Sequence, residues 1–216
     1  MDSPPARPRR RRIGLLGGTF NPIHYGHLRI ADAVRRRLAL DELRLVPAGR
    51  PPHKKGDASV APAADRLAMA RLAVSEFPGL SVSDVEVRRD GPSFTVDTLA
   101  EIRRETGPDA EIYFLVGADT LPEIPGWHQA ARLADLAEIV VVNRPGRSVR
   151  VTEELVRTFG EERARQLVER AIEVPPEPAS ATAVRDRVRR GLSLRGWVPE
   201  RVARYIREKG LFIESR

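Results

Sequence analysis

The chain has 216 residues, of which 41% are hydrophobic and 31% charged, and it contains no cysteine. This composition suits a globular protein with an ample core, and the missing cysteines exclude disulfides, thiolate metal sites and cysteine nucleophiles. The absence of cysteine is also consistent with a cytoplasmic location, where thiols stay reduced. No apolar run is long enough to span a bilayer, and no apolar stretch follows the basic N-terminus, so we expect neither a membrane partner nor a secretory signal.

The formal net charge of +7 is concentrated at the N-terminus. Residues 1–12 hold five arginines and one acid, a net +4, which leaves +3 for the rest of the chain. We predict that residues 1–12 form a disordered Arg/Pro-rich tail, whose functional alternative is a weak polyanion contact. The mild, interspersed charge of the remainder argues against a nucleic-acid partner. Residues 13–212 are predicted to form a single domain.

Apolar strand-like runs alternate with helix-like segments along this domain. The predicted strands are residues 13–16, 42–46, 80–87, 111–116, 138–143 and 171–174. The predicted helices are residues 28–40, 63–77, 96–106, 128–136, 153–158 with 161–170, 183–190 and 199–209. Alternation with short connections indicates an α/β fold, a doubly wound parallel sheet with helices on both faces.

The loop after the first predicted strand combines glycines with two histidines. It reads Gly17-Gly18-Thr19-Phe20-Asn21-Pro22-Ile23-His24-Tyr25-Gly26-His27. Glycines allow close backbone approach to a ligand, and the amides that open the following helix favour an anion. His24 and His27 add imidazole donors, so we predict a nucleotide-phosphate site. Metal ligation is the minority alternative, because no cysteine or nearby carboxylate cluster would complete the site.

Two further loops begin where predicted strands end, the edge at which open α/β sheets bind ligands. Residues 46–55 are rich in proline and basic residues, and they predict either a phosphate-facing lip carrying Lys54 or a stiff surface loop. Arg144 follows a solidly apolar strand, where its fork of donors suits a phosphate or a salt bridge. Asp119 follows another predicted strand, where it would either contact a ligand or cap the next helix. Trp127 would either stack on a ligand ring or pack in the core.

Hydroxyl residues open two of the predicted helices. Ser93 or Thr95 reads as an N-cap, with Asp97 in the first turn. Ser180 and Thr182 precede an arginine one turn into the next such helix. That arrangement predicts a second anion site, and ordinary capping is the alternative for at least one hydroxyl.

Residues 17–27 closely resemble the G-G-x-F-[DN]-P-x-H-x-G-H signature of the HIGH-type nucleotidylyltransferases. The segments at 46–55, 92–99, 114–127, 142–146 and 180–185 follow in the order typical of bacterial nicotinate-nucleotide (nicotinate-mononucleotide) adenylyltransferases. The resemblance covers residues 13–212, although residues 153–170 carry no signature. It implies a Rossmann-like fold whose residues 175–212 form a helical ATP-binding part.

The resemblance also implies an activity. The adenylyl group of ATP would pass to nicotinate mononucleotide, giving deamido-NAD and pyrophosphate in NAD biosynthesis, with Mg²⁺ carried by the ATP phosphates and no protein metal site. The alternatives are an amidated mononucleotide or phosphopantetheine as acceptor, or a non-catalytic nucleotide-binding module. The choice between a monomer and a homo-oligomer stays open.

The resemblance assigns roles to individual residues. The catalytic residues would be His24, His27, Lys54 and Arg185. The residues that bind ATP would be Gly17, Gly18, Thr19, Phe20, Ser180 and Thr182, together with Arg185. The residues that bind the mononucleotide would be Thr95, Asp119, Trp127 and Arg144. Two positions depart from the family pattern, since Ala181 replaces a serine and His128 stands where tyrosine is frequent.

Overall fold

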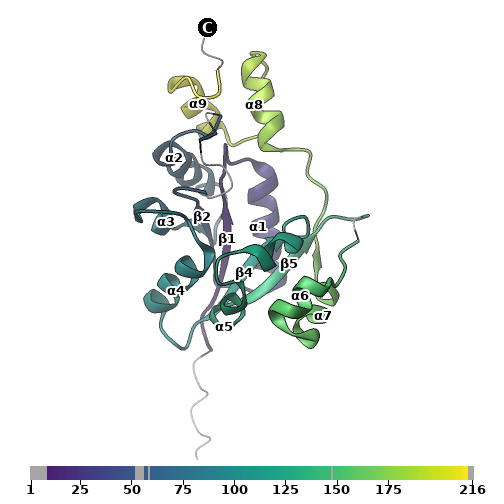
Figure 1. The fold of residues 1–216 in the computed structure, drawn as a ribbon. Coiled ribbons are helices and arrows are strands. Elements are labelled where there is room, and N and C mark those ends of the chain that lie inside the picture. The colour runs from purple at the N-terminus through teal and green to yellow at the C-terminus, as the bar shows by residue number, and fades with distance from the viewer. Residues whose placement is uncertain (1–8, 52–55, 58, 147, 214–216) are drawn as a thin grey trace, which may run out of the picture.

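The computed structural model describes residues 9–51, 56–57, 59–146 and 148–213. Six parallel strands form one sheet in the order β3-β2-β1-β4-β5-β6 (Figure 1). The strands are β1 (Arg12–Gly18), β2 (Glu42–Pro47), β3 (Leu80–Val82), β4 (Glu111–Gly117), β5 (Glu138–Asn143) and β6 (Ile172–Glu173). The predicted doubly wound parallel sheet is confirmed.

Helices cover both faces of this sheet. They are α1 (Tyr25–Arg37), α2 (Ala63–Val74), α3 (Val85–Arg88), α4 (Thr95–Thr106), α5 (Leu133–Leu136), α6 (Glu153–Phe159), α7 (Glu161–Glu169), α8 (Ala181–Arg189) and α9 (Glu200–Glu208). One core cluster contains residues of α1, α2, α8 and α9, and a second contains residues of α3 to α7. Val140 and Val142 of β5 face the first cluster while Ile139 and Val141 face the second, which explains why the whole strand is apolar.

Two predicted elements differ in the structure. The predicted strand at residues 80–87 ends at Val82, and residues 85–88 form α3 instead. Asp84 binds Arg88 one helical turn later, at 2.7 Å, which favours a helical turn over an extended chain. The predicted helix at residues 128–136 is broken into the 3-10 helix η3 (Ala130–Arg132) and α5, after Gln129 at a φ of 51°.

The order of the strands creates a crevice at the carboxyl ends of β1 and β4. From β1 the chain proceeds to β2 and β3 on one side, whereas β4 is followed by β5 and β6 on the other. Ligands of open α/β sheets bind at such a reversal. The helices α8 and α9 lie beyond the carboxyl end of β1 (Figure 1), where Tyr25 donates its backbone N–H to the Trp197 carbonyl at 3.0 Å. The segment between α8 and α9 is therefore bonded to the start of α1.

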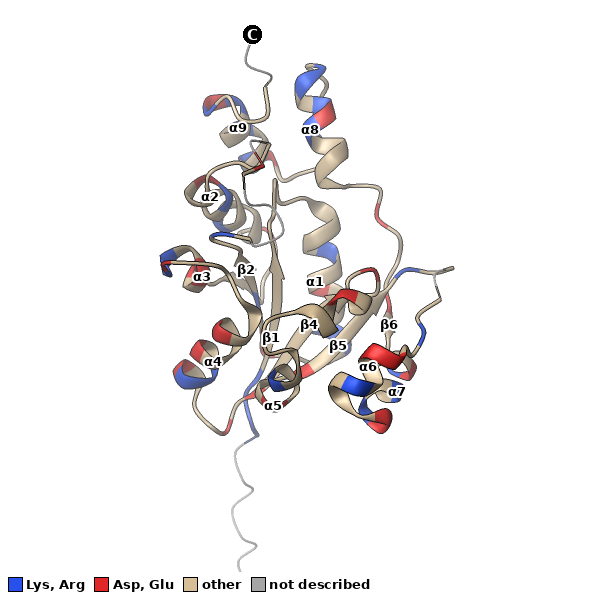
Figure 2. Ribbon diagram, in the orientation of Figure 1, with Lys and Arg blue, Asp and Glu red and all other residues tan. Residues whose placement is uncertain are grey.

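Charged residues of both signs are interspersed over the outer helices. Figure 2 shows basic and acidic residues mixed along α6, α7, α8 and α9. Near the N-terminus, Arg11 pairs with Glu42 at 2.7 Å, and Arg12 opens β1. No helix among the described residues is both long and apolar enough to cross a bilayer.

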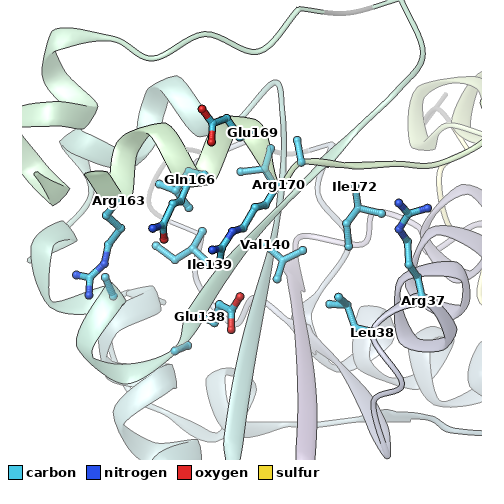
Figure 3. Close-up of a pocket in the computed structure, with 15 residues that line it drawn as sticks. Arg37, Leu38, Glu138, Ile139, Val140, Arg163, Gln166, Glu169, Arg170 and Ile172 are labelled. Atoms are coloured by element: carbon cyan, nitrogen blue, oxygen red, sulfur yellow. The ribbon is translucent and has the colours of Figure 1, made fainter. Parts of the chain in front are cut away.

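A groove of about 680 Å³ lies beside the amino-terminal half of β5, away from the crevice (Figure 3). It arises because β6 pairs with β5 only at Val142 and Asn143. Arg163 and Arg170 of the α7 region reach over it together with Glu138. None of the predicted site residues that the structure describes lines this groove, so we place the functional site at the crevice.

Candidate active site

The two histidines of the first loop lie against each other at the entrance to α1. His24 is the N-cap residue of α1, but its side chain caps no backbone amide there. Its ring centroid lies 3.7 Å from that of His27, with 30° between the ring planes. Phe20 is buried and meets the His27 ring edge-on at 4.9 Å. Packing of Phe20 therefore fixes the orientation of the imidazole pair.

His24 is buried and His27 is half-buried, and the shifts in pKa make both imidazoles neutral at pH 7. Burial lowers the pKa of His24 to about 4, and the charge of Arg144 adds to the effect. Burial likewise holds the pKa of His27 well below its ordinary value, with smaller contributions from His24 and Arg144. The Nδ1 atoms of both rings are buried without a hydrogen-bond partner among the described residues. An anionic ligand at the loop would favour the protonated rings, because it would oppose the effect of burial.

We predict a pH-dependent stability for the ligand-free protein. Histidine has a pKa near 6.5 in an unfolded chain, so the unfolded state binds more protons than the folded state between about pH 6.5 and pH 4. The free energy of unfolding should therefore fall as the pH falls through this window, by about 3 kcal/mol from His24. Urea unfolding of the wild type and of His24→Gln at pH 7.5 and pH 4.5 measures this term. The exposed His128→Gln is the control, and an equal pH dependence in wild type and His24→Gln would contradict the assignment.

Arg185 connects α8 to the histidine loop. Its Nη1 donates to the Asn21 carbonyl at 2.8 Å, and its Nε is buried without a partner among the described residues. Ser180 is the N-cap of α8, because its Oγ accepts the Ala183 backbone N–H at 3.2 Å. The capping alternative is thus confirmed for Ser180, while Thr182 is exposed in the first turn. A cleft of about 330 Å³ between residues 59–62, α8 and residues 210–213 includes Arg185.

Two cavities meet at the carboxyl ends of β1 and β4. The larger, about 590 Å³, is bounded by several predicted site residues, namely Gly17, Gly18, Thr19, Thr95 and Trp127. The smaller, about 120 Å³, is lined by His27, Asp119 and Arg144. Both share Leu16, Val116 and Gly117 as walls. The structure therefore brings the four predicted mononucleotide residues and the first three predicted ATP residues to one crevice. Neither cavity is lined by Phe20, Ser180, Thr182 or Arg185, and Lys54 lies outside the described residues.

Aromatic rings form much of the larger cavity. Trp127 packs edge-on against Phe114 at 6.3 Å between ring centroids, and its Nε1 is buried without a partner among the described residues. Phe94 stacks on His128 at 4.5 Å with 30° between the ring planes. Flat apolar walls with few polar groups suit a planar ligand ring.

The predicted cap of α4 is wrong at both candidate residues. The N-cap of α4 is Phe94, and no side chain caps the helix. Thr95 is the first helical residue, and Ser93 accepts the Arg50 backbone N–H at 3.1 Å instead. The first-turn amides of α4 therefore lack a side-chain cap, and Thr95 of this turn lines the larger cavity.

Comparison with known proteins identifies the family. The sequence model of the cytidylyltransferase-like family matches residues 15–187. The chain belongs to this family. It is 39% identical over 203 residues to a probable nicotinate-nucleotide adenylyltransferase of Dehalococcoides mccartyi, covering 93% of this chain and 97% of that one. A protein of the same name from Moorella thermoacetica is 42% identical over 201 residues, covering 93% and 91%.

Solved structures confirm the Rossmann-like fold of this cytidylyltransferase-like chain. Plasmodium falciparum nicotinic acid mononucleotide adenylyltransferase complexed with NaAD superposes with a TM-score of 0.70 at 17% identity, covering 94% of this chain and 98% of that one. The resemblance read from the sequence motifs is thus confirmed at the level of family and fold.

The sequence motifs do not include two buried charged residues that lie beside the crevice. Glu86 lines the larger cavity and accepts the Thr98 hydroxyl at 2.8 Å, and burial raises its pKa. Arg66 is 1% exposed in α2. The burial of Arg66 could have been predicted from the spacing of residues in α2. Residues 66, 69, 70 and 73 lie on one face of the helix, and the other three are apolar.

Proposed function

We propose that this protein transfers the adenylyl group of ATP to nicotinate mononucleotide, forming deamido-NAD and pyrophosphate in NAD biosynthesis. The observation that carries the proposal is the meeting of two cavities at the carboxyl ends of β1 and β4, one lined by His27 and the other by aromatic rings, beside a histidine loop that Arg185 contacts. The names of relatives about 40% identical over nearly the whole chain support it.

The reaction is a single displacement at phosphorus. An oxygen of the mononucleotide phosphate attacks the α-phosphorus of ATP, the new P–O bond forms, and the bond to the β-phosphate oxygen breaks to release pyrophosphate. The attacking phosphate is already ionised at neutral pH, so no strong general base and no covalent enzyme intermediate are required. Catalysis then consists of alignment of the phosphates and stabilisation of their charge.

We assign the phosphate chemistry to the imidazole pair and Arg185. His24 and His27 would donate N–H groups to the α-phosphoryl oxygens, with the backbone of residues 17–20 alongside. Arg185, with Thr182 and the first-turn amides of α8, would hold the leaving pyrophosphate. Lys54 keeps its predicted role at the phosphates as part of this proposal.

We assign the acceptor to the aromatic cavity. Trp127 would stack on the pyridine ring, Thr95 and Asp119 would contact the mononucleotide, and Arg144 would bind its phosphate. Among the described residues no group of three or more histidine and carboxylate side chains is placed to hold a metal. The donor set therefore suits Mg²⁺ bound mainly to ATP oxygens and water.

We predict that the acid acceptor is preferred to its amide. The uncapped first turn of α4 presents backbone amides and the positive end of the helix dipole near the cavity, which favours a carboxylate. We expect kcat/KM for nicotinate mononucleotide to exceed that for the amidated mononucleotide by about tenfold or more, since charge-assisted hydrogen bonds are the stronger ones. Initial rates of pyrophosphate release with the two acceptors measure the ratio. Equal values would contradict the assigned acceptor.

A further inference from the structure

Arg66 of α2 is a buried arginine, and each of its three guanidinium nitrogens donates to a backbone carbonyl. Its Nε donates to the Ala61 carbonyl at 2.9 Å, its Nη1 to that of Thr19 at 2.8 Å, and its Nη2 to that of Gly49 at 3.2 Å. The planar guanidinium is suited to holding several acceptors in fixed directions at once, which a lysine ammonium on a flexible stem is not.

The three carbonyls belong to segments that border the crevice. Thr19 lies in the histidine loop, Gly49 lies shortly after β2, and Ala61 lies shortly before α2. We call the described residues 48–51 and 59–62 the lip loop. Arg66 is thus bonded to both ends of the lip loop and to the loop that presents the two histidines.

Asn21 of the histidine loop reinforces the same connection. Its Oδ1 accepts the Ala61 backbone N–H at 2.9 Å, and its Nδ2 donates to the Ser59 carbonyl at 2.9 Å. Asn21 and Arg66 therefore satisfy both backbone groups of Ala61. At the other end of the lip loop, the Ala48 N–H donates to the Gly18 carbonyl at 2.9 Å.

Gly49 is held from its opposite side by Glu86. A Cβ atom at Gly49 would lie 2.1 Å from the Glu86 carbonyl oxygen, so the two backbones touch where only glycine fits. The buried Glu86 side chain also opposes, through its charge, the lowering of the Arg66 pKa by burial. Gly49 is consequently fixed between α3 and the Arg66 guanidinium.

We propose that Arg66 is a positioning residue for the transfer, which sets the spacing between the histidine loop and the lip loop. This inference rests on the proposed function, because the histidine loop would carry the imidazoles that contact the reacting phosphates. A buried cation is an expensive way to fill a core position, and an apolar side chain of similar size would serve packing better. Its three bonds to loop backbone are what an apolar residue cannot supply.

The test compares Arg66→Lys and Arg66→Ala with the wild type and with Arg71→Ala. Arg71 lies on the same helix, but its side chain is 57% exposed and pairs with Asp84 at 2.9 Å. Each variant is assayed well below its melting temperature, with the folded fraction measured by circular dichroism. We expect folded Arg66→Lys to lose about tenfold to a hundredfold in kcat with smaller changes in both KM values, since small misplacements of reacting groups are that costly. Arg71→Ala should keep wild-type kinetics.

Chemical rescue separates positioning from stability. Guanidinium at a concentration that does not denature should raise kcat of Arg66→Ala several-fold and leave Arg71→Ala unchanged. If Arg66→Ala does not fold, the kcat of folded Arg66→Lys decides between positioning and stability. Wild-type kcat in folded Arg66→Lys would overturn the proposal, as would activity losses that only follow the unfolded fraction.

A readout independent of turnover keeps this inference distinct from the proposed function. The imidazole NMR signals of His24 and His27 should shift in Arg66→Lys and stay unchanged in Arg71→Ala. If the wild type fails to transfer adenylyl groups, the proposed function fails while these signals still test the loop geometry. Unchanged imidazole signals in Arg66→Lys would overturn the inference even if the wild type is active.

Discussion

Replacing His27 with alanine should lower kcat by roughly a hundredfold to a thousandfold while leaving both KM values within a few fold, as expected for the loss of one preorganised donor. The His27 ring is held by Phe20 on its edge and by His24 beside it, so its N–H has a fixed direction before substrate arrives. Its contact should strengthen as charge builds up on the α-phosphoryl oxygens. An interaction made mainly in the transition state appears in kcat and not in KM.

Two further variants on α1 sharpen this measurement. His27→Asn keeps a neutral N–H donor and should retain more activity than His27→Ala. Arg36→Ala removes a side chain that is 73% exposed and paired with Asp32 at 2.9 Å, and it should behave as wild type. An unchanged kcat in His27→Ala would remove this residue from the catalytic role.

Replacing Arg185 with alanine should lower kcat/KM for ATP by about a hundredfold or more, in the range expected for a charged group that contacts phosphate. Two interactions would be lost together, the contact with the departing pyrophosphate and the bond to the Asn21 carbonyl. Arg185→Lys should recover little, because a compact ammonium on a flexible stem does not hold two separate acceptors in fixed directions as the planar guanidinium does. Initial-rate kinetics with varied ATP and saturating mononucleotide provide the measurement.

Arg190→Ala is the matched control, at the C-cap residue of α8. Its side chain is 66% exposed and pairs with Asp186 at 3.3 Å, so its removal changes the net charge equally without reaching the histidine loop. A comparable loss in both variants would indicate a general charge effect and would contradict the specific role of Arg185.

The elements predicted best are those whose signal is local. The bounds of β5 were predicted correctly, because an unbroken apolar run between polar residues identifies a strand buried on both faces. The predicted strand at residues 80–87 is wrong beyond Val82, because residues 85–88 form α3. In this turn Asp84 pairs with Arg88, and Val85 and Glu86 are buried.

The parts of the site that the motifs did not reveal depend on tertiary contacts. The acceptors of Arg66 are backbone carbonyls 5, 17 and 47 residues away along the chain, and no side-chain pattern marks them. The neutral state of the imidazole pair likewise follows from burial in the folded protein. The motifs pointed to residues that line the crevice, among them His27, Trp127 and Arg144. The contacts between such residues and their protonation states required the structure.

The fate of isotopically labelled phosphorus tests the proposed reaction most directly. The protein is incubated with nicotinate mononucleotide and ATP labelled at either the α- or the γ-phosphate, and the products are separated. We predict that the α label enters deamido-NAD and the γ label leaves in pyrophosphate, each only when the mononucleotide is present. Failure of the α label to enter any pyridine dinucleotide would contradict the account.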